Sequence, residues 1–154
     1  MKIAVIGGSG FVGTKLIDLL KKRAELSLIN IDKASSEKHN SITHIANVLD
    51  KEALVSLLKG VTLVVLLAAE HRDDVTPTSL YYDVNVKGMR NVLEAMEANK
   101  VNRIVFTSSV AIYGLDKTIP MNLFLQIHLT ITEKVSGKLN RYYKPGIKII
   151  QIGI

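Results

Sequence analysis

The chain has 154 residues, of which 47% are hydrophobic, so it can bury one sizeable core and its length favours a single domain. It contains no cysteine, which excludes disulfides and thiolate metal sites, and its four histidines lack close ligand spacing, so we expect no metal. Residues 1–116 carry 14 Lys and Arg against 13 Asp and Glu, whereas residues 117–154 carry six against one. Because these basic residues are scattered without regularly interleaved aromatic residues, we expect no nucleic-acid partner.

No apolar run approaches the length that crosses a bilayer, and the first residues are typical of a strand rather than a secretion signal. We therefore expect a soluble, cytoplasmic protein without a membrane partner.

Apolar runs and helical stretches alternate along the first two thirds of the chain. We predict strands over 2–6, 26–31, 61–67 and 103–107, and helices over 11–23, 50–59 and 79–99. Such alternation is typical of parallel βαβ units. The run at 61–67 is apolar at nearly every position, as expected for a strand covered by helices on both faces. The predicted fold class is therefore α/β, with a doubly wound parallel sheet of the Rossmann type.

Three glycines, Gly7, Gly10 and Gly13, follow the first predicted strand at intervals of three and lead directly into a helix. The first permits a tight turn, the second lets the backbone approach a diphosphate, and the third allows close packing of the helix. The helix N-terminus then supplies N–H donors and a positive dipole to the diphosphate. Glycines also mark ordinary turns, but the strand before them and the helix after them predict a dinucleotide site.

Asp32 ends the second predicted strand, where a carboxylate can accept hydrogen bonds from the ribose hydroxyls of adenosine. Its negative charge would repel the extra phosphate of NADP, so we predict NAD as the cofactor. The neighbouring Lys33 could reach such a phosphate, although a solvated lysine is the commoner role. The alternative for Asp32 is an ordinary turn residue at the end of a strand.

Further motifs occur in order along the chain: Leu67-Ala68-Ala69, Asn85-Val-Lys-Gly88, Asn91-Val-Leu-Glu-Ala95 and Val105-Phe-Thr-Ser-Ser-Val-Ala-Ile-Tyr-Gly114. Together with the glycine motif and Asp32 they resemble the extended short-chain dehydrogenase/reductases. Within that group, the motifs are similar to those of nucleotide-sugar epimerases and dehydratases of the UDP-glucose 4-epimerase type. The resemblance covers residues 1 to about 114 and implies an enzyme that transfers hydride to and from NAD at a carbon of a nucleotide sugar.

The same resemblance implies which residues contact the cofactor. Beyond the glycines and Asp32 they are Phe11, Val12, Asn47, Val48, Leu67, Ala68, Ala69, Asn85 and Ser108. Asn47 and Val48 would contact adenine, Asn85 would tie the long helix to the strand ends, and Ser108 would lie beside the nicotinamide. Ser109 would hydrogen-bond the reacting sugar hydroxyl and is the catalytic residue that the resemblance implies.

Proton transfer in this family uses a Tyr-x-x-x-Lys pair one helical turn apart, and that pair is missing from its expected place. The resemblance puts it roughly 15 to 30 residues after Tyr113. Tyr113 and Lys117 have the spacing, but they follow the last predicted strand directly and enclose Gly114, a poor start for a helix. We therefore expect impaired activity, and a non-catalytic dinucleotide-binding or regulatory protein is the alternative function.

Residues 1–116 form the predicted NAD-binding domain, and residues 117–154 form an atypical tail without the family's substrate lobe. Codons allowed for residues 127–140, regrouped by one base, permit a Tyr-Gly-Lys-Ser-Lys peptide. One hypothesis is therefore a slip of the reading frame between about Gly114 and Ile119. The other is a divergent but genuine segment. Under either hypothesis, residues 146–152 could add a strand. An exposed sheet edge would make a homo-oligomer or aggregation an expected outcome.

Overall fold

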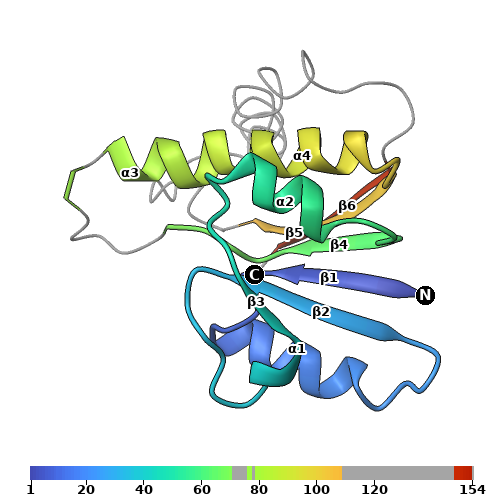
Figure 1. Ribbon diagram of the computed structural model, residues 1–154. Helices are drawn as coiled ribbons and strands as arrows, with labels where there is room; N and C mark the ends of the chain where they lie inside the picture. Colours follow the sequence, from blue (N-terminus) through green and yellow to red (C-terminus); the bar gives the residue numbers. More distant parts are fainter. Residues whose placement is uncertain (71–75, 78, 109–147, 154) are drawn as a thin grey trace, which may run out of the picture.

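A single parallel sheet organises the protein, shown in Figure 1 as a computed structural model that describes residues 1–70, 76–77, 79–108 and 148–153. Its strand order is β3-β2-β1-β4-β5-β6, and every neighbouring pair is parallel. The strands are β1 (Lys2–Ile6), β2 (Ser27–Asp32), β3 (Thr43–Ile45), β4 (Leu63–Leu66), β5 (Arg103–Ser108) and β6 (Lys148–Gly153). The order reverses between β1 and β4, which confirms the doubly wound α/β fold.

Helices cover both faces of the sheet (Figure 1). One face is covered by α1 (Phe11–Leu20), and the other by α2 (Lys51–Leu57), α3 (Ser79–Tyr82) and α4 (Met89–Ala98). A short 3₁₀ helix, η1 (Asn40–Ile42), precedes β3. A π-helical turn, η2 (Asp83–Gly88), joins α3 to α4. The two-sided cover explains why the central strands are almost wholly apolar.

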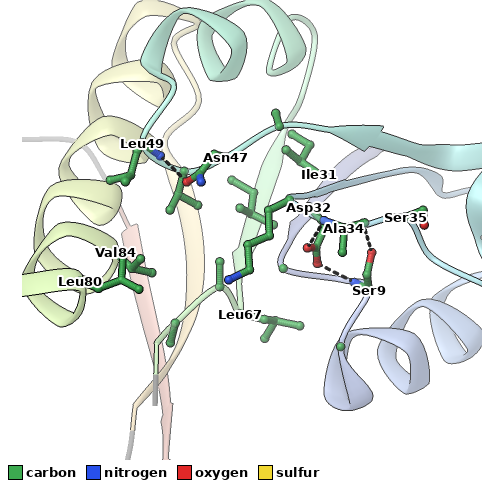
Figure 2. Close-up of a pocket in the computed structure, with 18 residues that line it drawn as sticks. Ser9, Ile31, Asp32, Ala34, Ser35, Asn47, Leu49, Leu67, Leu80 and Val84 are labelled. Atoms are coloured by element: carbon green, nitrogen blue, oxygen red, sulfur yellow. Dashed lines mark hydrogen bonds between the residues drawn. The ribbon is translucent and has the colours of Figure 1, made fainter. Parts of the chain in front are cut away.

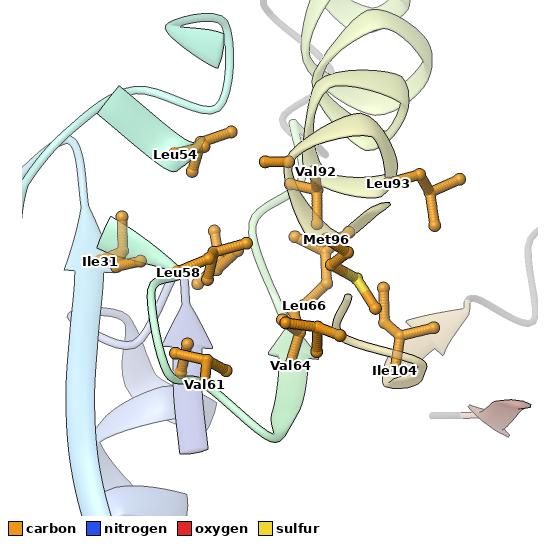
Figure 3. Packing of buried hydrophobic residues seen from close by; sticks show 14 of the residues in the cluster. Ile31, Leu54, Leu58, Val61, Val64, Leu66, Val92, Leu93, Met96 and Ile104 are labelled. Atoms are coloured by element: carbon orange, nitrogen blue, oxygen red, sulfur yellow. The ribbon is translucent and has the colours of Figure 1, made fainter. Parts of the chain in front are cut away.

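Alternation along β1 separates two cores. Ile3 and Val5 face α1 and pack with Ile17, while Ala4 and Ile6 belong to a larger cluster on the opposite face. Figure 3 shows that larger cluster, in which side chains from the α2 and α4 segments point towards the sheet. Five of them are fully buried: Leu54, Leu58, Val92, Ala95 and Met96. This packing holds the carboxyl ends of the central strands in fixed positions.

The predicted elements are confirmed, with ends that differ by up to three residues and with two omissions. Asp50 caps α2, because its Oδ1 accepts a hydrogen bond from the Ala53 amide at 3.0 Å. Gly60 follows α2 with φ of +71°. The three-residue β3 and η1 were not predicted, because the Thr-His-Ile run of β3 is too short and too polar to show a strand period.

The tail contributes to the sheet, since β6 pairs with β5 over six residues. The strand that the sequence suggested over residues 146–152 is therefore present, shifted by one or two residues. Backbone pairing of this kind satisfies the hydrogen-bonding groups along the edge of β5.

The long helix predicted over 79–99 is interrupted by η2. Gly88 ends this π turn, and a Cβ at Gly88 would lie 2.7 Å from Cγ2 of Val48. The missing side chain thus lets the helix approach the segment before α2. Hydrophobic periodicity does not reveal the single widened turn.

Within the described ranges, no helix is long and apolar enough to cross a membrane. The same residues contain no cluster of three His, Asp or Glu side chains suited to a metal ion.

Candidate dinucleotide site

A cavity of about 420 Å³ opens at the carboxyl ends of β1, β2 and β4 (Figure 2). Its lining is Ile6, Gly7, Ser9, Gly10, Ile31, Asp32, Lys33, Ala34, Ser35, Ala46, Asn47, Val48, Leu49, Leu67, Ala68, Ala69, Leu80 and Val84. The cavity lies where the strand order reverses, which is where open α/β sheets bind their ligands.

The three glycines of the motif meet different requirements. Gly7 has φ of +87°, and a Cβ there would lie 2.4 Å from the Ala68 nitrogen, so both conformation and space require glycine. A Cβ at Gly13 would lie 2.4 Å from the Cα of Gly8, so this glycine brings α1 against the turn. A Cβ at Gly10 would meet nothing closer than the Gly7 carbonyl oxygen at 3.9 Å. Gly10 therefore leaves open space that a ligand can enter.

The N-terminus of α1 begins at Gly10 without a side-chain cap and without an acidic residue in its first turn. Its first backbone N–H groups are thus available to a ligand from outside the helix. Helix N-termini of this kind bind phosphate through N–H donors and the helix dipole.

The Asp32 carboxylate ties the glycine turn to the end of β2. Its Oδ2 accepts a hydrogen bond from the Ser9 amide at 2.9 Å, and its Oδ1 accepts one from the Ala34 amide at 3.1 Å. Figure 2 shows these three residues together on one wall of the cavity. A carboxylate oxygen accepts more than one hydrogen bond, so each retains capacity for a ligand hydroxyl.

The facing wall is apolar. It includes Leu80 from α3 and Val84 from η2, which Figure 2 places opposite Asp32. Asn47 lies between the two walls, and its Oδ1 accepts a hydrogen bond from the Leu49 amide at 3.0 Å. Leu80 and Val84 were not predicted, although their spacing of four residues places them on one helix face.

Eight residues predicted from the sequence line the cavity: Gly7, Gly10, Asp32, Asn47, Val48, Leu67, Ala68 and Ala69. Phe11 and Val12 do not line it, since they lie at the start of α1 with 81% and 45% of their surface exposed. Gly13 is buried beneath the turn. Ser108 is the last residue of β5, and Ser109 lies outside the described residues.

Asn85 fastens the long helix to the chain that follows β4. Its Oδ1 accepts from the Glu70 amide and its Nδ2 donates to the Glu70 carbonyl, each at 2.9 Å. The contact agrees with the tie that the resemblance implied, but Asn85 does not line the cavity.

Residues 33–39, called the 33–39 loop below, run from β2 to η1 and supply part of the cavity wall. Asp18 of α1 anchors their far end, because its Oδ2 lies 2.6 Å from Lys38 Nζ and its Oδ1 lies 3.1 Å from His39 Nε2. The hydrogen bond from Lys38 holds the pKa of the Asp18 carboxyl below its ordinary value of 3.8. Partial desolvation opposes this shift, and the charges of Lys38, His39 and Lys15 add to it.

Known proteins of one family match this chain. The family model described as "NAD dependent epimerase/dehydratase family" matches residues 3–142. The chain belongs to this family. It is 57% identical over 118 residues to the N-acetyl-alpha-D-glucosaminyl-diphospho-ditrans,octacis-undecaprenol 4-epimerase of Escherichia coli O157:H7, covering 77% of this chain and 35% of that protein. It is 31% identical over 137 residues to a UDP-glucose 4-epimerase of Bacillus subtilis (strain 168), covering 79% and 40%.

Solved structures of an epimerase and a dehydratase share the fold of this family member. UDP-glucose 4-epimerase from Brucella ovis in complex with NAD superposes with a TM-score of 0.78 at 21% identity, covering 99% of this chain and 51% of that one. DesIV, a dTDP-glucose 4,6-dehydratase from Streptomyces venezuelae with NAD bound, gives a TM-score of 0.76 and 21% identity, covering 99% and 55%. The chain thus spans about half of these solved proteins.

NAD is the cofactor of this family, and the site described above fits it. Gly10 leaves room for a diphosphate beside the uncapped N-terminus of α1. Asp32 presents a carboxylate to the same cavity, where ribose hydroxyls can reach it.

Substitutions at Gly7 and Gly10 should separate folding from binding. In Gly10→Ala the added methyl group has room, so stability should change by less than about 1 kcal/mol, but NAD affinity should fall because the methyl occupies the diphosphate position. Gly7→Ala should lower stability by about 1–3 kcal/mol or more, through its φ of +87° and the Ala68 clash. Urea unfolding and calorimetric titration of both variants test this; equal stability losses would contradict it.

The lowered pKa of Asp18 should make the free energy of unfolding depend on pH. Its folded pKa lies below 3.8, so its carboxylate stabilises the fold above pH 3.8, and this contribution is lost as the pH falls through the lower folded value. Asp18→Asn should therefore be less stable than the wild-type chain near neutral pH, and the difference should narrow below pH 3.8. Urea unfolding of both proteins from about pH 6 to about pH 3 measures it; a constant difference would contradict the prediction.

Proposed function

We propose that this chain is the NAD-binding part of a sugar 4-epimerase whose substrate carries its sugar on a diphosphate. The observation that carries the proposal is one cavity that joins the opening at Gly10, the N-terminus of α1 and the Asp32 carboxylate. These groups match the diphosphate and the adenosine ribose of NAD. Both curated relatives described above are named as 4-epimerases, which favours epimerisation over dehydration.

The substrate class follows from what the relatives' names share. One is named for a glucosaminyl group carried on a diphospho-undecaprenol, and the other for UDP-glucose. A hexose attached to a diphosphate is common to both. We propose this class for the complete protein, with a nucleotide sugar as its soluble form.

Each residue of the site then has a role in holding the cofactor. The glycine turn and the N-terminus of α1 bind the diphosphate, and Asp32 accepts hydrogen bonds from the adenosine ribose while repelling a 2′-phosphate. Asn47 has its Oδ1 bonded within its own turn, so its Nδ2 is the group that would donate to adenine. When bound, NAD would accept a hydride from the sugar carbon, which oxidises the hydroxyl there, and would then return the hydride.

The sugar side of the reaction depends on the residues after β5. We propose that Ser108 lies beside the nicotinamide and that Ser109 hydrogen-bonds the sugar hydroxyl. A general base of the Tyr-x-x-x-Lys kind has no well-placed counterpart in residues 117–154. The chain therefore binds NAD with impaired or absent turnover, which also makes a non-catalytic dinucleotide-binding protein the second candidate.

Calorimetric titration tests this function. The chain should bind NAD more tightly than NADP, and Asp32→Asn should weaken NAD binding by about tenfold and reduce the preference, because a charged acceptor is lost. Glu25→Gln is the matched control, since Glu25 is exposed and does not line the cavity. Incubation with UDP-glucose or UDP-N-acetylglucosamine should yield no 4-epimer by chromatography.

Failure to bind NAD in a folded sample would overturn the proposed cofactor site. Formation of a 4-epimer as fast as by the Bacillus subtilis UDP-glucose 4-epimerase assayed alongside would overturn the impaired turnover and require a general base that the Tyr-x-x-x-Lys pattern does not identify.

The origin of residues 117–154 has its own test. We propose that residues 1–116 are the family domain and that the reading frame slips between about Gly114 and Ile119. Sequencing of the coding DNA from codon 105 onward should show that a one-base shift restores a Tyr-Gly-Lys-Ser-Lys peptide. Codons that forbid this peptide would show instead that the tail is a genuine segment, and the binding role would gain support.

A further inference from the structure

A fully buried asparagine lies behind the cavity wall, on the face of the sheet that α1 covers. Asn30 of β2 is 0% exposed and points to the same face as Leu28, which packs in the apolar cluster beneath α1. An apolar residue is the usual occupant of such a position, because burying an amide costs free energy unless it is fully hydrogen-bonded. The presence of Asn30 therefore needs a physical reason.

Asn30 donates both of its side-chain hydrogens to hydroxyl groups. Its Nδ2 lies 3.0 Å from Ser9 Oγ in the glycine turn and 3.0 Å from Thr43 Oγ1, its register partner on β3. Ser9 Oγ donates onward to the Ala34 carbonyl at 2.9 Å, and Thr43 Oγ1 donates to the His39 carbonyl at 2.7 Å. One carboxamide thus connects the glycine turn, β3 and both ends of the 33–39 loop.

The direction of these bonds restricts which residue can serve at position 30. Each hydroxyl has a single proton, and each uses it on a backbone carbonyl, so both can only accept from residue 30. An amide meets this demand with two N–H donors. An aspartate offers none, and an aliphatic residue offers neither donor nor acceptor.

The arrangement leaves one polar atom unpaired. Asn30 Oδ1 is buried and has no hydrogen-bond partner among the residues that the structure describes. A Cβ at Gly8 would lie 2.3 Å from this oxygen, so Gly8 is required by the space that Asn30 occupies. An unpaired buried oxygen lowers stability. Asn30 is therefore better explained by the positions it holds than by the stability it contributes.

The segments that Asn30 connects carry the cofactor-facing groups. Ser9 and Ala34 both line the cavity, and their amides both donate to the Asp32 carboxylate. His39 extends the connection to α1, because its ring nitrogen Nε2 lies 3.3 Å from the Thr14 carbonyl oxygen. Asn30 itself does not line the cavity, so it acts on the cofactor through these neighbours.

We infer that Asn30 is a positioning residue, which holds the glycine turn and the 33–39 loop in the geometry that grips the adenosine ribose and diphosphate. The inference rests on the proposed NAD site. It predicts that affinity depends on Asn30 more strongly than stability does, which a purely structural residue would not show.

Two variants of the 154-residue chain test the inference. Asn30→Val removes both donors and also the unpaired oxygen, and Thr43→Val removes one acceptor at nearly constant shape. Each variant should bind NAD and ADP-ribose about three- to tenfold more weakly than the wild-type chain. The factor should be the same for both ligands, because the nicotinamide is remote from the groups that Asn30 positions. The double variant should bind NAD no more weakly than Asn30→Val alone, since both changes break the same hydrogen-bond network.

Asn99→Ala is the matched control. Asn99 also donates both side-chain hydrogens, to the Val55 and Ala95 carbonyls, but it lies at the end of α4 and outside the cavity lining. This variant should lower the melting temperature and leave the NAD affinity unchanged. Asn30→Val should instead weaken NAD binding and leave the melting temperature nearly unchanged.

Amide hydrogen exchange gives a reading that does not require NAD. The Ser9 and Ala34 amides should exchange faster in Asn30→Val than in the wild-type chain, and at the wild-type rate in Asn99→Ala. Unchanged exchange at both amides, unchanged affinity in Asn30→Val, or an equal affinity loss in Asn99→Ala would each overturn the inference. A wild-type chain that binds no NAD would overturn the proposed function, and the exchange rates would still decide the role of Asn30.

Discussion

The close approach of the backbone at the glycine turn is the constraint on which the site depends. The chain leaves β1 at Gly7 with φ of +87°, and the Gly7 amide donates to the Ile31 carbonyl at 2.8 Å. A Cβ at Gly7 would lie 2.4 Å from the Ala68 nitrogen, so the ends of three strands meet with no room for a side chain. The cavity, the Asp32 wall and the start of α1 are all placed by this contact.

The two faces of the sheet bury different kinds of side chain. The face under α2 and α4 is packed with apolar side chains such as Leu54, Val92 and Met96, and it supplies most of the buried hydrophobic surface. The face under α1 also buries apolar residues, but near the carboxyl ends of the strands it buries Asn30 and His39. Polar burial there fixes loop positions by directed hydrogen bonds, which apolar contacts cannot do.

In the proposed function, NAD binding and turnover depend on different segments of the chain. Among the described residues, those on the adenosine side of the site belong to strands, a helix and well-anchored loops. The sugar side, as proposed, uses Ser109, which follows β5 in the sequence. The chain also spans 35% and 40% of the two curated relatives. In the proposed function, NAD binding and turnover use different segments, so one can be retained while the other is impaired.

The sequence by itself determined the fold class, the order of the first strands and helices, and much of the cavity lining, including Gly7, Asp32 and Ala68. Strand periodicity, glycine spacing and a carboxylate at a strand end are local signals, and local sterics and hydrogen bonding enforce them. Only the tertiary structure decided that the side chains of Phe11 and Val12 are exposed and outside the cavity lining, that a π turn interrupts the long helix, and that Asn30 joins the glycine turn to the 33–39 loop. The bonds of Asn30, for example, join residues that are distant in sequence, Ser9 and Thr43, and no local pattern encodes such contacts.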